Sequence, residues 1–224
     1  RCYGFDDVAL VPGMATINPN EVDPSWVIAD KRFKIPILAA AMDGVVDVKF
    51  AVAMGKLGGL AALNLDGVQT RYDNPSSVLE KIAKATPQKA TELVQGVYLK
   101  PIKEKLIAKR IAEIKKHNVS AVASCIPQNA KRFGAIAQDA SADFFIVQST
   151  VTSVNHISRE YKALDLHKFC AAMKIPVIIG NCVTYAGAWE RMQTGCVGVL
   201  GGIGPGAACT TRAGTARRRR RRTR

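Results

Sequence analysis

The sequence lacks any apolar run of the roughly 18–20 residues that a membrane span requires. It also lacks the pattern of a charged segment, an apolar segment and a cleavage site that marks a signal peptide. Hydrophobic residues make up 48% of the chain, which is ordinary for a globular protein, and a length of 224 residues suits one domain or two. We therefore expect a soluble, cytoplasmic protein that does not contact a membrane.

Metal-ligand patterns are also missing. The six cysteines form no CxxC pair and no zinc-ligand spacing, and the three histidines do not cluster with them. The sequence therefore gives no support to a structural metal site and favours a reducing compartment. The cysteines are Cys2, Cys125, Cys170, Cys182, Cys196 and Cys209.

Basic residues outnumber acidic ones, and the formal net charge is +14. Residues 213–224 hold seven arginines, and without them 25 basic residues stand against 18 acidic ones. The other lysines intermix with glutamate, as in residues 100–116, which is typical of a solvated helix face. Nucleic acid is therefore not an expected partner, although the bias suits anionic nucleotides.

The Arg-rich segment 213–224 has three possible interpretations. It could be a localisation or nucleic-acid-binding tail, because arginine contacts to phosphate need no fold. It could be a solvated, self-repelling, disordered end. A shifted reading frame or an altered terminus would also produce such a run, and this interpretation fits best.

Short apolar runs alternate with longer amphipathic segments along the chain. Each run is nearly continuous in apolar residues, as strands buried on both faces are. Such alternation predicts right-handed βαβ units and a parallel sheet, either doubly wound or closed into a barrel. The missing GxGxxG after the first run argues against a dinucleotide-binding Rossmann domain. The runs are Ile37–Met42, Leu60–Leu65, Ser120–Ile126, Asp143–Gln148, Pro176–Gly180 and Val197–Gly202.

Helical periodicity separates these runs. Apolar residues recur at helical spacing from Val46 to Leu57 and again from Ile102 to Ile114, which plain core packing explains. The segment from Asp66 to Val119 is longer than one crossover requires. We expect it to hold two helices with a turn around Thr86-Pro87, and it is too short for an inserted regulatory domain.

The segment with the clearest chemistry is Gly201–Arg212, which reads GGIGPGAACTTR directly after a predicted strand. Its glycines let backbone groups approach a ligand or ion closely. Cys209 would lie at the carboxyl end of a strand, where α/β barrels place their active sites. A lone cysteine in such a turn is more often inert, but a thiol there becomes reactive if a helix N-terminus or cations lower its pKa.

The pattern GxGPGxxCTTR resembles the catalytic loop of IMP dehydrogenases and GMP reductases. Three other segments resemble the same family in the same order: Tyr3–Pro12 (the segment leading into the barrel), Ala39–Gly44 (the end of the first strand) and Ile178–Thr184 (the fifth). The resemblance implies a TIM (β/α)8 barrel. Residues 1–212 would form a partial barrel with about six of the eight strands, and residues 213–224 an Arg-rich, disordered tail.

The resemblance also implies a role for each matching residue. Cys209 would attack C2 of the purine, and Thr211 would help to position the attacking water or ammonia. The carbonyl groups of Gly204, Gly206 and Cys209 would bind K+. Met42 and Asn181, with Gly206 and Cys209, would contact the substrate.

The cofactor site departs from the family at one position. The family usually has an aspartate at the end of the fourth strand, where this chain has Gln148, followed by Ser149. Gln148 can hydrogen-bond a ribose but carries no charge. We expect Gln148 and Ser149 to contact the nicotinamide cofactor.

The activity implied is the NAD-dependent oxidation of IMP to XMP through a covalent thioimidate on Cys209. One alternative is an NADPH-dependent GMP reductase, and another is an inactive, truncated chain that only binds nucleotides. The absence of room for a cystathionine-synthase-type insertion places the chain nearest a branch without that domain. The expected partners are IMP or GMP, NAD or NADP, and further copies in a homotetramer or homo-octamer. Because two strands are missing after Arg212, we expect little turnover from the chain as written.

Overall fold

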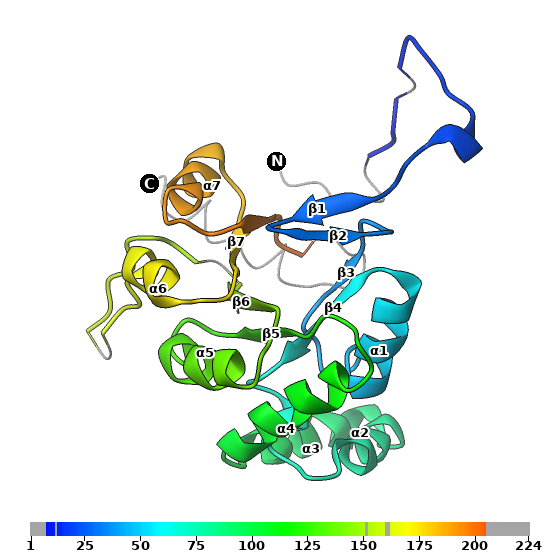
Figure 1. The fold of residues 1–224 in the computed structure, drawn as a ribbon. Coiled ribbons are helices and arrows are strands. Elements are labelled where there is room, and N and C mark those ends of the chain that lie inside the picture. Colours follow the sequence, from blue (N-terminus) through cyan, green and yellow to red (C-terminus); the bar gives the residue numbers. More distant parts are fainter. Residues whose placement is uncertain (1–7, 12, 151, 160–161, 205–224) are drawn as a thin grey trace, which may run out of the picture.

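The computed structural model describes residues 8–11, 13–150, 152–159 and 162–204. Its centre is a curled sheet of six parallel strands, arranged in chain order as β3-β4-β5-β6-β7-β8 (Figure 1). All six predicted apolar runs overlap one of these strands, so the predicted α/β class and the parallel sheet are confirmed. The strands are β3 (Leu38–Ala39), β4 (Leu60–Asn64), β5 (Val122–Cys125), β6 (Phe144–Gln148), β7 (Val177–Cys182) and β8 (Gly198–Gly201).

The sheet is buried on both faces because its side chains alternate between two separate cores. In β6, Phe144 and Ile146 belong to a small cluster that also contains Phe33, on the concave side of the sheet. Phe145 and Val147 point the other way, into a larger cluster shared with the helices. This arrangement explains why the strands read as continuous apolar runs rather than as an alternating pattern.

Helices cover the convex side of the sheet (Figure 1). Several begin at a side chain that caps the first turn: Asp47 accepts from the Phe50 N–H, and Thr184 accepts from the Gly187 N–H. The helices are α1 (Val48–Leu57), α2 (Pro75–Ala83), α3 (Pro87–Leu99), α4 (Glu104–Lys115), α5 (Ala130–Asp139), α6 (Leu166–Ala172) and α7 (Tyr185–Met192).

The segment from Asp66 to Val119 holds three α-helices and a short 3-10 helix (Val68–Thr70), so the expectation of two helices was wrong. The predicted turn at Thr86-Pro87 is present, because Thr86 is the extended residue before α3. The additional break falls at Lys100, whose backbone is extended. Pro101 follows it, and a proline disfavours helical backbone in the residue before it.

A short antiparallel hairpin precedes the sheet and was not predicted. It pairs β1 (Trp26–Ile28) with β2 (Lys31–Phe33). The Phe33 ring packs against Phe144 at 6.1 Å between centroids, and Lys31 Nζ lies 2.5 Å from Asp143 Oδ1. Asp143 directly precedes β6, so the hairpin packs at the amino ends of the strands and leaves the carboxyl ends open.

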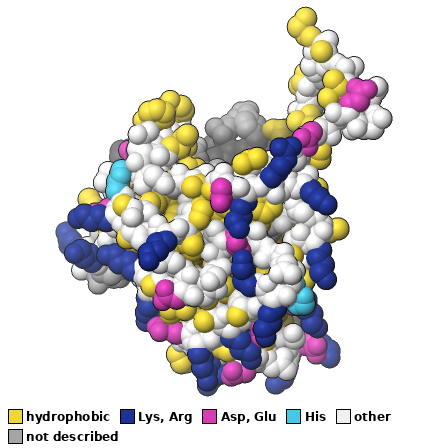
Figure 2. Space-filling view, viewed as in Figure 1, with side chains coloured by type: hydrophobic (Ala, Val, Ile, Leu, Met, Phe, Trp, Pro, Cys, Tyr) yellow, Lys and Arg dark blue, Asp and Glu magenta, His cyan; other side chains and the backbone are white. Residues whose placement is uncertain are grey.

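Basic side chains are spread over the visible face and interleaved with acidic ones rather than gathered in one patch (Figure 2). This distribution agrees with a solvated surface. Within the part of the chain that the structure describes, no helix is long and apolar enough to cross a membrane.

Candidate functional site

The carboxyl ends of the strands surround a cavity of about 590 Å³. In a parallel α/β sheet, ligands bind at this end because the loops that leave the strands meet there. Four residues that the sequence singled out lie together in its lining: Gln148, Ser149, Asn181 and Gly204. The lining also includes Ala41, Asn64, Asp66, Arg71, Tyr98, Ile102, Ser124, Cys125, Ile126, Asn129, Thr150 and Ile203.

Backbone hydrogen bonds join the predicted residues across the ends of β6 and β7. The Ser149 N–H donates to the Gly180 carbonyl at 3.1 Å, and the Asn181 N–H donates to the Ser149 carbonyl at 3.2 Å. The Asn181 side-chain amide then donates to the Gly202 carbonyl at 3.0 Å, beyond the end of β8. Three successive strand ends are therefore held at fixed spacing around Asn181.

Met42 does not join this group of lining residues. The Met42 side chain is 57% exposed, and it is the neighbouring Ala41 that lines the cavity. Gly204 has a φ of +58°, a left-handed conformation that glycine adopts readily. Cys209, Thr211 and Gly206 lie outside the described residues, so their roles stay predictions.

The wall formed by β4 and β5 is polar, and the sequence analysis missed it. Asp66 follows β4 and accepts hydrogen bonds from the Ile126 N–H at 2.7 Å and from the Asn129 amide at 2.6 Å. Burial raises the pKa of Asp66, although these two hydrogen bonds oppose the rise. Its position directly after a predicted strand was the signal that could have identified it.

Arg71 brings a positive charge to this wall. One of its terminal nitrogens donates to the Asp66 carbonyl at 3.0 Å, and the guanidinium carbon lies 5.5 Å from the centre of the Tyr98 ring. Tyr98 in turn donates its hydroxyl hydrogen to the carboxylate of Asp43. Burial and the Asp43 charge both raise the pKa of Tyr98 well above its usual value.

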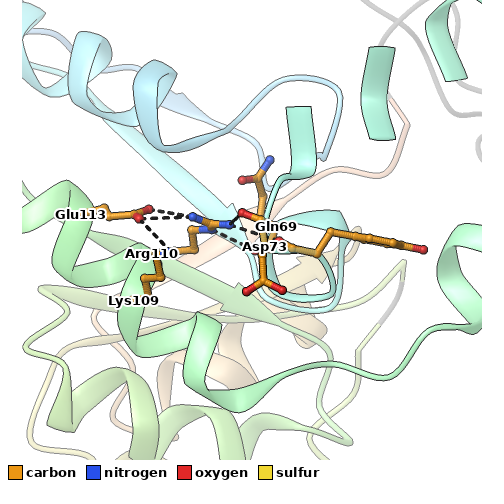
Figure 3. Close-up of polar contacts among 6 residues, drawn as sticks. Gln69, Asp73, Lys109, Arg110 and Glu113 are labelled. Atoms are coloured by element: carbon orange, nitrogen blue, oxygen red, sulfur yellow. Dashed lines mark hydrogen bonds and ion pairs between the residues drawn. The ribbon is translucent and has the colours of Figure 1, made fainter. Parts of the chain in front are cut away.

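The buried Arg110 of α4 forms hydrogen bonds to the backbone of the segment that carries Arg71 (Figure 3). Arg110 Nε donates to the Gln69 carbonyl at 3.1 Å, and a terminal nitrogen donates to the Asp73 carbonyl at 2.9 Å. Glu113 balances the charge of Arg110, with an N–O distance of 2.9 Å. The segment between β4 and α2 is thus fixed by contacts with Arg110, which does not line the cavity.

The described cysteines include two poor nucleophiles. Cys125 lines the cavity, but burial first and the Asp66 charge second raise the pKa of its thiol well above the ordinary value. Burial also raises the pKa of Cys170. Because the thiolate is the reactive form, neither of these two residues is poised to attack a substrate. The described residues contain no group of three side chains suited to hold a metal ion.

A smaller cavity of about 90 Å³ adjoins the large one, and Ser149 lines both. Its other lining residues come from the segments that follow β5 and β6, among them Gln128, Thr152, His156 and Lys162. The residue that follows β6 therefore contributes to two neighbouring cavities.

Comparison with known proteins assigns the chain and its fold to a family. The model of the IMP dehydrogenase / GMP reductase domain matches residues 2–219. The chain belongs to the IMP dehydrogenase/GMP reductase family. A crystal structure of an IMP dehydrogenase/GMP reductase-like protein from Corynebacterium glutamicum superposes with a TM-score of 0.84 at 28% identity, over 91% of this chain and 55% of that one. The predicted TIM-barrel relationship is thereby confirmed.

Relatives in this family include proteins with and without an assigned reaction. An uncharacterised oxidoreductase of Mycolicibacterium smegmatis is 31% identical over 94% of this chain and 58% of its own length. The inosine-5'-monophosphate dehydrogenase of Cryptosporidium parvum is 29% identical over 93% of this chain and 53% of its own length. The family member described here thus spans a little over half the length of these relatives.

Proposed function

We propose that this chain carries the nucleotide- and cofactor-binding part of an oxidoreductase that converts IMP to XMP with NAD. One observation carries the proposal: Gln148, Ser149, Asn181 and Gly204 come from three strand ends and line one cavity. These residues were singled out from the sequence by their match to family positions. Their convergence is what a shared binding site requires.

The lining suits a nucleotide and a nicotinamide cofactor. Its volume of about 590 Å³ lies within the range of roughly 300–1,000 Å³ that is usual for small-molecule sites. The Gln148 amide and the Ser149 hydroxyl both donate and accept hydrogen bonds, as ribose hydroxyls require. Asn181 is oriented by its bond to Gly202, so its position is fixed before a ligand arrives.

Cys209 follows Gly204 by only five residues in the sequence, and we assign it the covalent step. Its thiolate would add to C2 of IMP, and the C2 hydrogen would leave with its electron pair as a hydride. A bound nicotinamide ring would supply the hydride acceptor. Water, positioned with the help of Thr211, would then add to C2 and release XMP and the thiol. We propose K+ binding by the Gly204, Gly206 and Cys209 carbonyls, which would fix the loop.

Cofactor absorbance tests the activity directly. Purified protein with IMP and NAD should form reduced cofactor slowly, in keeping with the little turnover expected, and Cys209→Ala should abolish this signal. Cys170→Ala is the matched control, because Cys170 lies outside the cavity lining and should retain the activity. Turnover only with GMP and NADPH would assign the reductase reaction instead. Equal activity in Cys209→Ala would contradict the covalent mechanism.

Domain organisation and assembly belong to the same proposal. We propose that residues 1–212 form the catalytic part and that residues 213–224 form a separate tail. Shortening the chain to residue 212 should then leave nucleotide affinity unchanged. We also propose assembly as a homotetramer or homo-octamer, which light scattering coupled to size exclusion measures directly.

A further inference from the structure

Arg191 is a charged side chain inside the protein. It lies near the end of α7 and is only 2% exposed. Its Nε donates to the Thr152 hydroxyl at 3.1 Å, and one terminal nitrogen donates to the same hydroxyl at 2.9 Å and to the Thr152 carbonyl. The other terminal nitrogen donates to the Gly187 carbonyl one turn earlier in α7. Each of the three guanidinium nitrogens thus donates to a neutral oxygen atom.

No carboxylate lies within ion-pair distance of Arg191 in the part of the chain that the structure describes. The other buried arginine, Arg110, is paired with Glu113 at 2.9 Å. A buried cation without a counter-charge is costly, because carbonyl and hydroxyl dipoles replace only part of the lost hydration. The hydrogen bonds of Arg191 offset part of this cost and at the same time hold the buried Thr152 hydroxyl and carbonyl in place.

The acceptors of Arg191 connect two segments that form the candidate site. Thr152 belongs to the segment after β6, close to Ser149 and Thr150, which line the large cavity. The Thr152 N–H donates to the Asn181 carbonyl at 3.2 Å, and that carbonyl also lies 3.5 Å from a terminal nitrogen of Arg191. Arg191 therefore forms hydrogen bonds both to Thr152, in the segment after β6, and to Asn181, near the end of β7.

Gly187 shows how tightly this region is packed. A Cβ atom added at Gly187 would lie 3.1 Å from a terminal nitrogen of Arg191 and 3.0 Å from the Thr184 hydroxyl. The first turn of α7, the Arg191 guanidinium and Thr152 thus form one packed unit. A shift of the guanidinium would be passed on to Thr152 and to the Asn181 carbonyl.

We propose that Arg191 is a positioning residue that sets Thr152, and with it Ser149, against Asn181 and so shapes the cofactor side of the cavity. This inference rests on the proposed function for its ligand, but the coupling between Arg191 and the segment is a property of the protein alone. Arg191 does not line either cavity, so it acts through Thr152 and Asn181. Sequence reasoning did not find it, because the partners lie 39 residues apart.

Hydrogen exchange of the ligand-free full chain tests the coupling. Arg191→Ala should speed exchange at the amides of Ser149, Thr152 and Asn181, whereas β4 and β5 should exchange as before. Ile111→Ala is the matched control, because it opens a cavity in the core near α4 and lowers stability without touching Thr152. Unchanged exchange in Arg191→Ala, or equal acceleration in Ile111→Ala, would overturn the proposal.

Chemical rescue separates positioning from general destabilisation. Guanidinium at millimolar concentration should restore slow exchange in Arg191→Ala, whereas urea, which has a similar shape but no charge, should not. Arg191→Lys should rescue only in part, because an ammonium cannot reach the same acceptors in a planar fork. Failure of guanidinium to restore any protection would contradict the assigned role.

The same variants also test how Arg191 affects the binding of NAD. In Arg191→Ala the KM for NAD should rise by about 10- to 100-fold, the effect of a small misplacement of binding groups, while kcat changes less. A change confined to kcat would contradict positioning of the cofactor segment. If the unmodified protein binds no nucleotide, the proposed function fails while the exchange measurements still decide whether Arg191 positions the segment.

Discussion

The hydroxyl of Tyr98 donates a hydrogen bond to Oδ2 of Asp43, across 55 residues of sequence. This contact joins the end of α3 to the turn after β3, and Tyr98 itself lines the large cavity. Asp43 also accepts from the Val68 N–H at 2.9 Å. The Asp43 carboxylate thus connects three segments at the rim of the site.

Tyr98→Phe tests this connection. It should lower the free energy of unfolding by about 1 kcal/mol, because it removes one hydrogen bond to a charged group at a half-exposed position. Burial and Asp43 raise the pKa of Tyr98 in the folded state. The stabilisation by the neutral phenol is therefore complete below pH of about 10, the pKa in the unfolded chain, and is lost as the pH rises toward the folded pKa.

Urea unfolding from pH 8 to pH 11 measures both effects. The difference between the unmodified protein and Tyr98→Phe should be constant up to about pH 10 and shrink above it. A difference that grows with pH would show that the phenol is not held in its neutral form.

Gly67→Ala should disturb the same carboxylate. A Cβ atom at position 67 would lie only 1.9 Å from Oδ1 of Asp43, so the side chain of Asp43 has to move. We expect a loss of about 1–3 kcal/mol, the usual cost of overpacking. Gly96→Ala is the control: it lies in α3 with nothing within 4 Å of the added atom, and it should stabilise the protein by about 0.5–1 kcal/mol. Thermal melting should therefore show a lower Tm for Gly67→Ala and a higher Tm for Gly96→Ala than for the unmodified protein.

Asp143→Asn should destabilise the amino end of the sheet by about 2 kcal/mol. The Asp143 side chain is only 8% exposed and lies 2.5 Å from Lys31 Nζ and 2.8 Å from Lys115 Nζ. Burial alone would raise the pKa of Asp143, but hydrogen bonds from Lys115, Lys31 and the Ala121 N–H outweigh it, and the net pKa is lowered.

The lowered pKa sets the pH range of the Asp143 effect. The stabilisation is fully present above about pH 4, the pKa in the unfolded chain, and is lost as the pH falls through the folded pKa. Acid titration of stability should show this loss in the unmodified protein and not in Asp143→Asn. Asp23→Asn, which breaks the exposed pair with Arg32, should change little. An equal effect of the two substitutions would contradict the assigned role of burial.

The strands were predictable because burial on both faces imposes a local signature. Phe144–Gln148 reads as one apolar run, since alternate residues enter different cores, and the run alone locates β6. The glycine-rich segment after β8 was recognisable for a similar reason, because its residue types are tied to backbone geometry and chemistry. Both signals lie within a few neighbouring residues.

The contacts that shape the site left no such local signal. Asp66 and Asn129 are 63 residues apart, and Arg191 and Thr152 are 39 apart. Their pairing depends on how the strand ends meet, which periodicity does not specify. The β1–β2 hairpin was missed because its strands have three residues each, too few for a recognisable alternation.

Alkylation should distinguish the cysteines. Burial raises the pKa values of Cys125 and Cys170, so both should react slowly with iodoacetamide at pH 8. We expect Cys209 to be labelled first and IMP to slow that labelling. Peptide mass spectrometry over a time course gives the rate for each cysteine. Faster labelling of Cys125 would contradict both its buried environment and the assignment of Cys209.

The covalent intermediate on Cys209 gives the most direct test of the central claim. The full chain is mixed with IMP and NAD, quenched in acid and digested. The mass of the peptide that contains Cys209 is then measured by mass spectrometry. We predict a mass increase on Cys209 that corresponds to the purine nucleotide less two hydrogens, the C2 hydride passed to NAD and the thiol proton, and it should be present only when both IMP and NAD are supplied. A nucleotide adduct on a different cysteine, or no adduct at saturating IMP and NAD, would contradict the assignment of Cys209 as the nucleophile.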